Sequence, residues 1–278
     1  MILNLKELLC KQIPNQDFTN NSCIKYIFFF VIIFYCSNYA VSQNVIYKDS
    51  LGKYSVRNTA GEYLTTIKYD TVYSYYEGVA KVRLNKKFGL INKQGREITQ
   101  LKYDKIGNFN EGVALAISNK KIGFIKKNGQ ELTQLKYDMA SEFNDGIALV
   151  SIGNLAKKNY AECKWGIINK RGKEIVSLKY DALIFFSNRY IRVKSDNKWG
   201  IINKKGQIIL PIEYDGIMEL NEGLAPILLK NKFGFINEKG KQIIPIKYDN
   251  VGEFINGKAK VEKNNKTFYI DRKCNVVD

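Results

Sequence analysis

The chain has 278 residues, of which 45% are hydrophobic and 13% aromatic, so it is long enough to bury a sizeable core. It contains no histidine, which removes the usual acid–base residue at neutral pH and the commonest metal ligand. The formal net charge is +17, but only seven of the 44 basic residues are arginine. Because arginine is the main side chain for bidentate reading of base edges, a sequence-specific nucleic-acid reader is disfavoured, whereas non-specific attraction to polyanions or an acidic cell surface stays open.

The first 42 residues have the features of an export signal. Lys25 precedes a run of eleven apolar, tyrosine and cysteine residues from Tyr26 to Cys36. This run is shorter than the roughly 20 residues that span a bilayer, but it matches the hydrophobic region of a signal peptide. Small residues in Ala40-Val41-Ser42 predict cleavage after Ser42. We expect a periplasmic, outer-surface or secreted protein; the alternative is an uncleaved membrane anchor formed by residues 26–36.

Cleavage would remove three of the five cysteines and leave Cys163 and Cys274. A lipoprotein is disfavoured because the bulky Tyr35 precedes Cys36. The two remaining cysteines could pair in an oxidising compartment, but they lack a spacing motif, so we expect two separate thiols. No Cys-x-x-Cys metal site is present.

Three markers recur through the rest of the chain with one period. A glycine that follows a bulky residue recurs in steps of 34, 43, 34 and 34 residues: Gly89, Gly123, Gly166, Gly200 and Gly234. A Tyr-Asp pair keeps the same spacing: Tyr69-Asp70, Tyr103-Asp104, Tyr137-Asp138, Tyr180-Asp181, Tyr214-Asp215 and Tyr248-Asp249. The third marker is a polar residue before glycine: Glu77-Gly78, Glu111-Gly112, Asp145-Gly146, Glu222-Gly223 and Asn256-Gly257. A fixed period in this range indicates a repeat array.

Each repeat contains a predicted β-hairpin and one strand before it. The hairpin turns have Asn first and Gly fourth, which is typical of a type I turn followed by a left-handed glycine. They are Asn58–Gly61, Asn92–Gly95, Asn169–Gly172, Asn203–Gly206 and Asn237–Gly240, with the variant Lys126–Gly129. The preceding strands are Val79–Val82, Val113–Ala116, Ile147–Val150, Tyr190–Val193, Leu224–Ile227 and Lys258–Val261. The stretch from Tyr-Asp to the glycine marker is interpreted as a connection, packed down by Phe109, Phe143, Leu220 and Phe254.

The repeated phrase, most complete from Lys198 to Asp215, resembles the signature of the WG-repeat (KWG) family over roughly residues 52–271. Tryptophan stands only at Trp165 and Trp199; Phe88, Ile122 and Phe233 replace it with other bulky apolar side chains. This argues for packing rather than for a unique ligand contact in every repeat. The resemblance implies interaction rather than reaction, because the family has no general assigned activity.

We therefore expect an all-β fold, a tandem array of about six three-stranded β-meander units with a period of 34 residues. An open, solenoid-like stack is preferred over a closed propeller, because each unit carries its own complete meander. The repeat domain spans 43–278, with a nine-residue insertion around Ile152 to Cys163. Its units are 52–85, 86–119, 120–163, 164–197, 198–231 and 232–265, with a terminal cap at 266–278.

Two repeated features invite a functional interpretation. The six Tyr-Asp carboxylates could form a row of cation or sugar sites, but recurrence in every unit favours a scaffold in which Tyr fills the inter-repeat core and Asp accepts backbone N–H groups. The lysines beside each Trp-Gly could align into a basic stripe that binds an anionic polymer or glycan, or could be a solvated face that blocks edge-to-edge association. The candidate binding residues are Lys86, Lys87, Lys120, Lys121, Lys198 and Lys232.

No nucleophile–base pair, phosphate-binding glycine loop or metal-ligand spacing is present in the sequence, so no catalytic, cofactor-binding or metal residue is predicted. We expect an exported, non-catalytic scaffold that binds a protein partner or a cell-envelope component. The alternative is a polyanion or carbohydrate binder that uses the lysine stripe and exposed aromatic residues. An enzyme with a carboxylate site hidden in the repeats ranks third.

Overall fold

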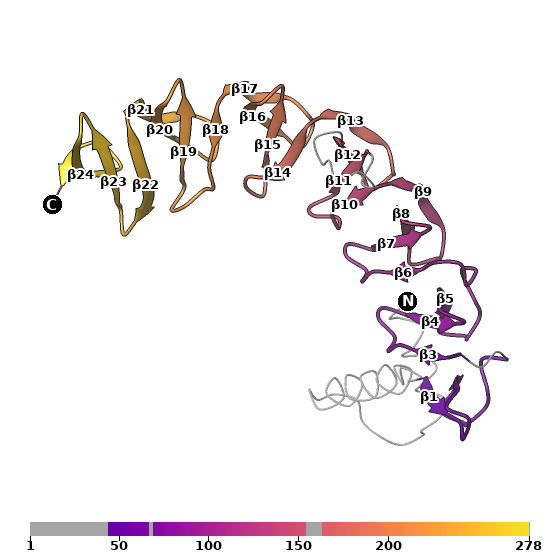
Figure 1. Ribbon diagram of the computed structural model, residues 1–278. Coiled ribbons are helices and arrows are strands. Elements are labelled where there is room, and N and C mark those ends of the chain that lie inside the picture. Colours follow the sequence, from indigo (N-terminus) through magenta and orange to yellow (C-terminus); the bar gives the residue numbers. More distant parts are fainter. Residues whose placement is uncertain (1–43, 67–68, 154–162, 278) are drawn as a thin grey trace, which may run out of the picture. The chain divides into compact units, whose positions relative to one another are not determined.

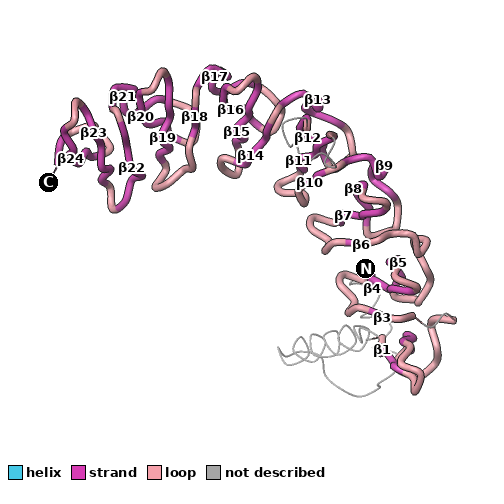
Figure 2. The backbone as a smooth tube through the Cα atoms, in the orientation of Figure 1, coloured by secondary structure: helices cyan, strands magenta, loops and turns pink. Residues whose placement is uncertain are grey.

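The computed structural model describes residues 44–66, 69–153 and 163–277. The predicted leader (1–42) and most of the insertion around 152–163 lie outside the described residues. The described residues form strands and loops only (Figure 2). No helix in these ranges is long and apolar enough to cross a membrane.

The chain divides into two compact parts, one of residues 1–45 and 57–63 and the other of residues 46–56 and 64–278. In the first part, the predicted turn Asn58–Gly61 is confirmed. The Gly61 N–H donates to the Asn58 carbonyl at 3.0 Å, and the Glu62 N–H donates to Asn58 Oδ1 at 2.9 Å. The second part holds the repeat array.

The sheets are antiparallel and follow the chain in order (Figure 1). A two-stranded sheet comes first, formed by β1 (Val45–Lys48) and β2 (Tyr54–Arg57). Next comes the three-stranded sheet β3-β4-β5, and then five four-stranded sheets, β6 to β9, β10 to β13, β14 to β17, β18 to β21 and β22 to β25. Neighbouring strands in each sheet are consecutive in sequence, so every sheet is a simple meander.

Strands in equivalent positions have similar bounds. The first strands are β3 (Thr71–Val72), β6 (Lys105–Ile106), β10 (Met139–Ala140), β14 (Ala182–Phe185), β18 (Gly216–Ile217) and β22 (Asn250–Ile255). The second strands are β4 (Val79–Leu84), β7 (Val113–Ser118), β11 (Ile147–Ile152), β15 (Tyr190–Ser195), β19 (Leu224–Leu229) and β23 (Lys258–Lys263). The third strands are β5 (Lys87–Asn92), β8 (Lys121–Lys126), β12 (Lys164–Asn169), β16 (Lys198–Asn203), β20 (Lys232–Asn237) and β24 (Lys266–Asp271). The fourth strands are β9 (Glu131–Tyr137), β13 (Glu174–Tyr180), β17 (Ile208–Tyr214), β21 (Gln242–Tyr248) and β25 (Val276–Val277).

The repeat array and its all-β class are confirmed, and five of the sheets have one strand more than the predicted meander. In the sheet β3-β4-β5 the predicted strand after Gly95 is represented only by the isolated bridges Ile91–Glu97 and Phe88–Tyr103. The segment after Tyr-Asp, interpreted from sequence as a connection, pairs with the second strand. In the second full repeat the Asp104 N–H donates to the Ile117 carbonyl at 2.7 Å, and the Gly107 N–H donates to the Leu115 carbonyl at 2.8 Å. Most of these first strands have two residues, too few for an alternating pattern to be visible in the sequence.

The hydrophobic core lies between successive sheets. One cluster joins Phe124 and Tyr137 of sheet β6 to β9 with Phe143, Val150 and Ile168 from the next repeat. Equivalent clusters lie at the other junctions of the array. The main contacts between strands of different sheets connect each sheet with the next one along the chain, as expected for an open stack.

The glycine of the Trp-Gly pair is explained by the crossing of the fourth strand over the third. In sheet β14 to β17 the pairing register shifts between Trp199 and Ile201. A Cβ atom on Gly200 would lie 2.7 Å from the Leu210 carbonyl oxygen. Only glycine lets the two backbones approach this closely, so the marker residue fixes where the fourth strand crosses.

Candidate functional site

The Tyr-Asp carboxylates hold successive repeats together. Asp104 Oδ1 pairs with Lys87 Nζ at 2.5 Å, while Oδ2 accepts the Asn119 N–H at 2.8 Å. Lys87 begins the hairpin of the same repeat, and Asn119 lies in the β7–β8 turn of the next one. Each Asp therefore joins two repeats, and the scaffold interpretation of these residues fits this geometry.

The same three-way contact recurs along the array. Asp70, Asp138, Asp181, Asp215 and Asp249 pair with Lys53, Lys121, Lys164, Lys198 and Lys232 in that order. Their second oxygens accept N–H groups from Asn85, Gly153, Asp196, Lys230 and Asn264. Among the described residues, no group of three or more acidic or cysteine side chains could hold a metal ion.

The six candidate lysines take two structural roles. Lys87, Lys121, Lys198 and Lys232 are the ion-pair partners of Asp104, Asp138, Asp215 and Asp249. Lys86 and Lys120 occupy the second position of two-residue hairpin turns, with φ angles of 66° and 62°. Four of the six candidate lysines therefore have an acidic partner, which reduces the net charge that these residues present.

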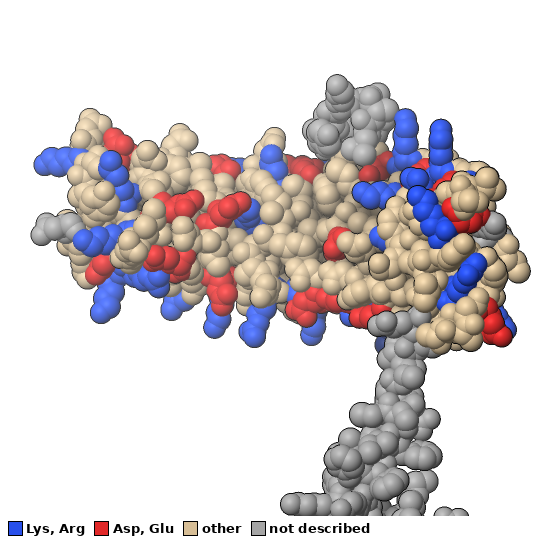
Figure 3. All heavy atoms as spheres, turned by 90° about the horizontal axis from the view of Figure 1, so that it is seen from below, with Lys and Arg blue, Asp and Glu red and all other residues tan. Residues whose placement is uncertain are grey.

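The surface drawn in Figure 3 agrees with this distribution. Along the lower margin of that face, lysine and arginine side chains alternate with aspartate and glutamate rather than forming an unbroken basic patch. Further acid–base pairs connect repeats, including Lys170 with Glu111 at 2.8 Å and Arg272 with Glu222 at 3.0 Å.

One loop departs from the repeat. In most repeats the first and second strands are joined by a polar residue and a glycine that both have positive φ, for example Glu111 at 51° and Gly112 at 84°. In sheet β14 to β17 these two positions are Asn188 and Arg189, and neither has a positive φ. The left-handed conformation is energetically unfavourable for arginine. The chain therefore forms a wider loop, in which the Phe186 N–H donates to the Tyr190 carbonyl at 2.9 Å.

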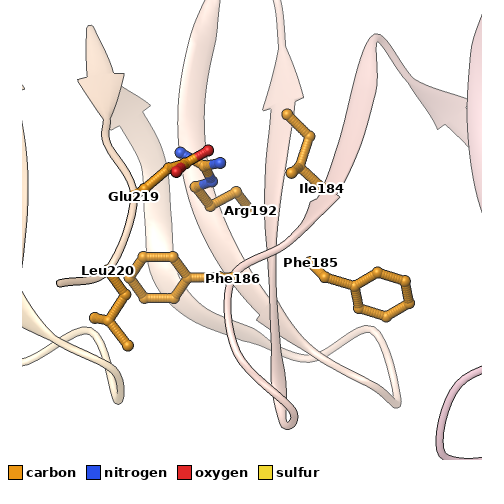
Figure 4. Close-up of a pocket in the computed structure, with 6 residues that line it drawn as sticks. All are labelled: Ile184, Phe185, Phe186, Arg192, Glu219 and Leu220. Carbon is orange, nitrogen blue, oxygen red and sulfur yellow. The ribbon is translucent and has the colours of Figure 1, made fainter. Parts of the chain in front are cut away.

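A cavity of about 230 Å³ lies beside this loop, between sheets β14 to β17 and β18 to β21. Its lining combines apolar and charged side chains, Ile184, Phe185, Phe186, Arg192, Glu219 and Leu220 (Figure 4). Phe186 is 7% exposed, and Leu220 packs against the same hydrophobic cluster. In the close-up, the Arg192 and Glu219 side-chain ends lie on one side and Phe186 and Leu220 on another.

Arg192 is only 9% exposed, which is unusual for arginine. One guanidinium nitrogen donates to the Ile217 carbonyl at 2.7 Å, while the buried Nε has no hydrogen-bond partner among the described residues. Burial lowers the pKa of Arg192, and the charge of Glu219 acts in the opposite direction. Both side chains line the cavity, where Glu219 is exposed and Arg192 is largely buried.

A second cavity of about 590 Å³ shares Phe186 and Leu220 with the first. Its remaining lining is polar: Ser187, Asn188, Arg189, Glu238 and Lys239. Glu238 and Lys239 belong to the hairpin turn between β20 and β21. We call the two adjoining cavities the Phe186 groove. It is the candidate functional site.

None of the groove residues was predicted as a site from sequence, although a signal was present. The glycine marker is missing from this repeat, and the packing positions Phe109, Phe143, Leu220 and Phe254 have their fourth-repeat equivalent at Phe186. Of these predicted packing residues, Phe143 and Phe254 are buried, and Phe109 and Leu220 pack against core clusters. A break in the periodicity was thus the local sign of the groove.

Cys163 and Cys274 do not form a disulfide with each other. Cys163 is buried, and the Cys274 sulfur lies 3.1 Å from the hydroxyl of Tyr248. The prediction of two separate thiols agrees with this arrangement.

The repeat unit identifies the family. A model of the WG containing repeat matches six segments, residues 56–88, 88–121, 122–155, 165–199, 199–233 and 233–266. The chain belongs to the WG-repeat family. Its bulky residue before glycine, at Trp165 and Trp199 in the most typical repeats, is partly buried and packs against the inter-repeat clusters.

No curated protein matches the chain significantly in sequence. Among solved structures, Kluyveromyces lactis Hsv2p is similar at 12% identity and a TM-score of 0.35, over 72% of this WG-repeat chain and 74% of that protein. Citrobacter koseri AztD gives 12% identity and a TM-score of 0.30, over 81% and 77%. PorZ of Porphyromonas gingivalis is a surface component of a type-IX secretion system. It is similar at 11% identity and a TM-score of 0.31, over 82% of this chain but only 38% of PorZ. These similarities are too low to transfer a function.

Proposed function

We propose that this WG-repeat protein is an exported, non-catalytic scaffold that binds a protein partner or an envelope component through the Phe186 groove. The observation that carries the proposal is the contrast between the regular repeats and the irregular loop. The recurring charges are used to hold repeats together, whereas the loop that lacks the Gly marker opens a groove with an incompletely bonded arginine. A departure from a regular repeat is where such proteins often carry their binding function.

Export is supported by the apolar run Tyr26–Cys36 and the small residues before Gln43. Mass spectrometry of the protein recovered from its producing cells tests this part of the proposal. A mature N-terminus at Gln43 in an extracytoplasmic fraction is the expected result. Full-length protein in the cytoplasm would contradict it.

A binding role is tested with two charge-reversal variants of equal net change. Arg189→Glu with Lys239→Glu alters the rim of the Phe186 groove, because both side chains are exposed and line the larger cavity. Arg171→Glu with Lys205→Glu is the matched control, since these exposed residues stand in the equivalent hairpin turns of other repeats. We expect only the first variant to lose binding to solubilised envelope proteins in a quantitative pull-down. Equal loss in both, or no loss, would contradict a role for the groove.

The second candidate function is binding of a polyanion, favoured by the formal charge of +17. Titration with an anionic polymer at low and physiological salt separates the two. Polyanion binding should weaken steeply with salt and fall equally in both charge-reversal variants, because it depends on diffuse charge. Groove binding depends on particular side chains and should resist salt.

A further inference from the structure

We propose that the smaller cavity of the Phe186 groove binds the C-terminal residue of a peptide chain, with the terminal carboxylate on Arg192 and an apolar last side chain against Phe186 and Leu220. This inference rests on the proposed role of the groove in protein binding and adds the chemistry of the partner. It follows from the cavity's charge pattern, its size and its continuity with the larger cavity.

The charge pattern selects a ligand with a negative end. Arg192 is nine-tenths buried and donates to one carbonyl, while its buried Nε–H has no acceptor among the described residues. A carboxylate is the strongest partner for such a group, because the planar guanidinium can donate two parallel hydrogen bonds to it. On a planar guanidinium the Nε–H and the neighbouring terminal N–H point the same way, so one carboxylate can accept from both.

Glu219 lines the same cavity and indicates that the ligand also carries a hydrogen-bond donor. A carboxylate can only accept hydrogen bonds, so it calls for a donor on the ligand. The last peptide bond of a chain supplies an N–H next to the terminal carboxylate. Glu219 is exposed and lines the same cavity as Arg192, so a ligand that offers an N–H beside its carboxylate matches both side chains, whereas a carboxylate alone matches only Arg192.

The size and continuity favour a chain end over a free small molecule. About 230 Å³ is below the range of roughly 300–1,000 Å³ typical of drug-sized ligand pockets, and suits a single residue. Phe186 and Leu220 line both cavities, so a residue seated beside Arg192 would lead directly into the larger one. Ser187, Asn188, Arg189, Glu238 and Lys239 then offer polar contacts to the preceding residues of the peptide.

The test uses the purified protein and two pools of fluorescent hexapeptides with five random positions and a last residue of leucine. One pool ends in a free carboxylate and the other in a carboxamide. Fluorescence anisotropy should show the free-acid pool binding at least ~10-fold more tightly, since a hydrogen bond to a charged group contributes about 1.5–3 kcal/mol. Equal binding of the two pools, or binding of neither, would overturn the proposal. Free leucine that competes as well as the peptides would also overturn it.

Variants of Arg192 test whether this side chain produces the preference for a free carboxylate. Arg192→Met should remove the preference for the free carboxylate, and Arg192→Lys should keep only part of it, because an ammonium cannot form the bidentate contact. Lys81→Met is the matched control, since Lys81 holds the equivalent position in the first full meander and bonds Asn108 at 3.0 Å. A loss in Lys81→Met as large as in Arg192→Met would show that the preference is not made at this cavity.

The outcome separates this inference from the proposed function. If envelope proteins depend on the Arg189 and Lys239 rim while neither peptide pool binds, the groove is a protein-binding site of another chemistry. If Arg192→Met fails to fold, Glu219→Gln serves instead: it preserves shape, removes the charge that accepts the last peptide N–H and should weaken both pools several-fold, and unchanged binding of both pools would overturn the proposal.

Discussion

The buried hydroxyl of Tyr103 donates to Glu131 Oε1 of the next repeat at 2.9 Å. Tyr103 is 1% exposed, and burial together with Glu131 raises its pKa well above the usual value. Lys102 pairs with the same carboxylate at 2.7 Å, so the pKa of Glu131 is lowered, first by Lys102 and also by Tyr103. Tyr69 and Glu97 repeat the tyrosine–glutamate bond at 2.9 Å.

Tyr103→Phe should lower the free energy of unfolding by about 1.5 kcal/mol, because a buried hydrogen bond to a charged acceptor is lost. Chemical denaturation at neutral pH measures this. Tyr180→Phe is the matched control: the equivalent acceptor position is Ile208, and the Tyr180 hydroxyl has no protein partner within the described residues. Tyr180→Phe should change the free energy of unfolding by no more than about 0.5 kcal/mol. Equal effects at the two sites would contradict the role of Glu131.

Two substitutions of Asp138 distinguish the contributions of the hydrogen bond and the ion pair to the stability of the inter-repeat contact. Its carboxylate is 9% exposed, accepts the Gly153 N–H at 2.9 Å and pairs with Lys121 at 2.6 Å. Asp138→Ala should destabilise by about 1–3 kcal/mol, because a backbone donor loses its acceptor. Asp138→Asn keeps an acceptor oxygen and should cost no more than about 1 kcal/mol, the usual value of an exposed ion pair. If Asn is as damaging as Ala in urea denaturation, the charge rather than the N–H bond dominates.

The sequence allowed the architecture to be predicted because its signals are local. The Asn-to-Gly turns bond as expected, with the Gly95 N–H donating to the Asn92 carbonyl at 3.0 Å. The period then places the second, third and fourth strands of the four-stranded sheets. The two-residue first strands, such as β3 and β6, could not be predicted, since their pairing depends on contact with the second strand and not on a pattern of their own.

The side-chain partners and the groove depend on how repeats stack. Lys87 pairs with Asp104, 17 residues away, and that Asp bonds the Asn119 N–H, 15 residues further. From sequence alone Lys87 is one of many lysines, and no local pattern names Asp104 as its partner. Arg192 and Glu219 come from different repeats and meet only when sheets β14 to β17 and β18 to β21 are stacked. The missing glycine at position 189 was the one visible sign of this site.

Acid should destabilise the array through the inter-repeat aspartates. The pKa values of Asp70, Asp104, Asp181, Asp215 and Asp249 are all lowered, chiefly by hydrogen bonds from their lysine partners. A carboxyl with a lowered pKa in the folded state stabilises the fold above its unfolded pKa of about 3.9 and loses this contribution as the pH falls through the folded value. The melting temperature should therefore hold from neutral pH to about pH 5 and fall below about pH 4.

The matching control replaces two of these residues, in the variant Asp104→Asn with Asp215→Asn. This variant should melt lower at neutral pH and show a shallower decline between about pH 4 and pH 2, because two of the titrating groups are gone. A decline as steep as in the unmodified protein would assign the acid sensitivity to other carboxylates, of which Glu111 and Glu222 also have lowered pKa values.

Lys120→Gly should stabilise the protein. Asn119 and Lys120 form a two-residue turn with φ angles of 50° and 62°, the conformation for which Asn-Gly is preferred. Glycine relieves the left-handed strain but loses more conformational entropy on folding than lysine does. The net gain in the free energy of unfolding should be about 0.5–1 kcal/mol. Lys121→Gly is the control, because Lys121 begins strand β8 and pairs with Asp138, and it should destabilise by about 1 kcal/mol. Thermal unfolding of both variants decides the matter, and a destabilised Lys120→Gly would contradict the turn assignment.

Gly200→Ala tests why glycine follows the bulky residue in this family. The added Cβ would lie 2.7 Å from the Leu210 carbonyl oxygen and 2.8 Å from that of Pro211, so the fourth strand must shift. We expect a loss of about 1–3 kcal/mol, typical of overpacking. Gly216→Ala is the matched control, since its nearest contact is 3.4 Å away at the end of the flexible Met218 side chain, and should change stability by no more than about 0.5 kcal/mol. A neutral Gly200→Ala in denaturant titration would mean that the third and fourth strands do not need this close crossing, and the glycine would then require another explanation.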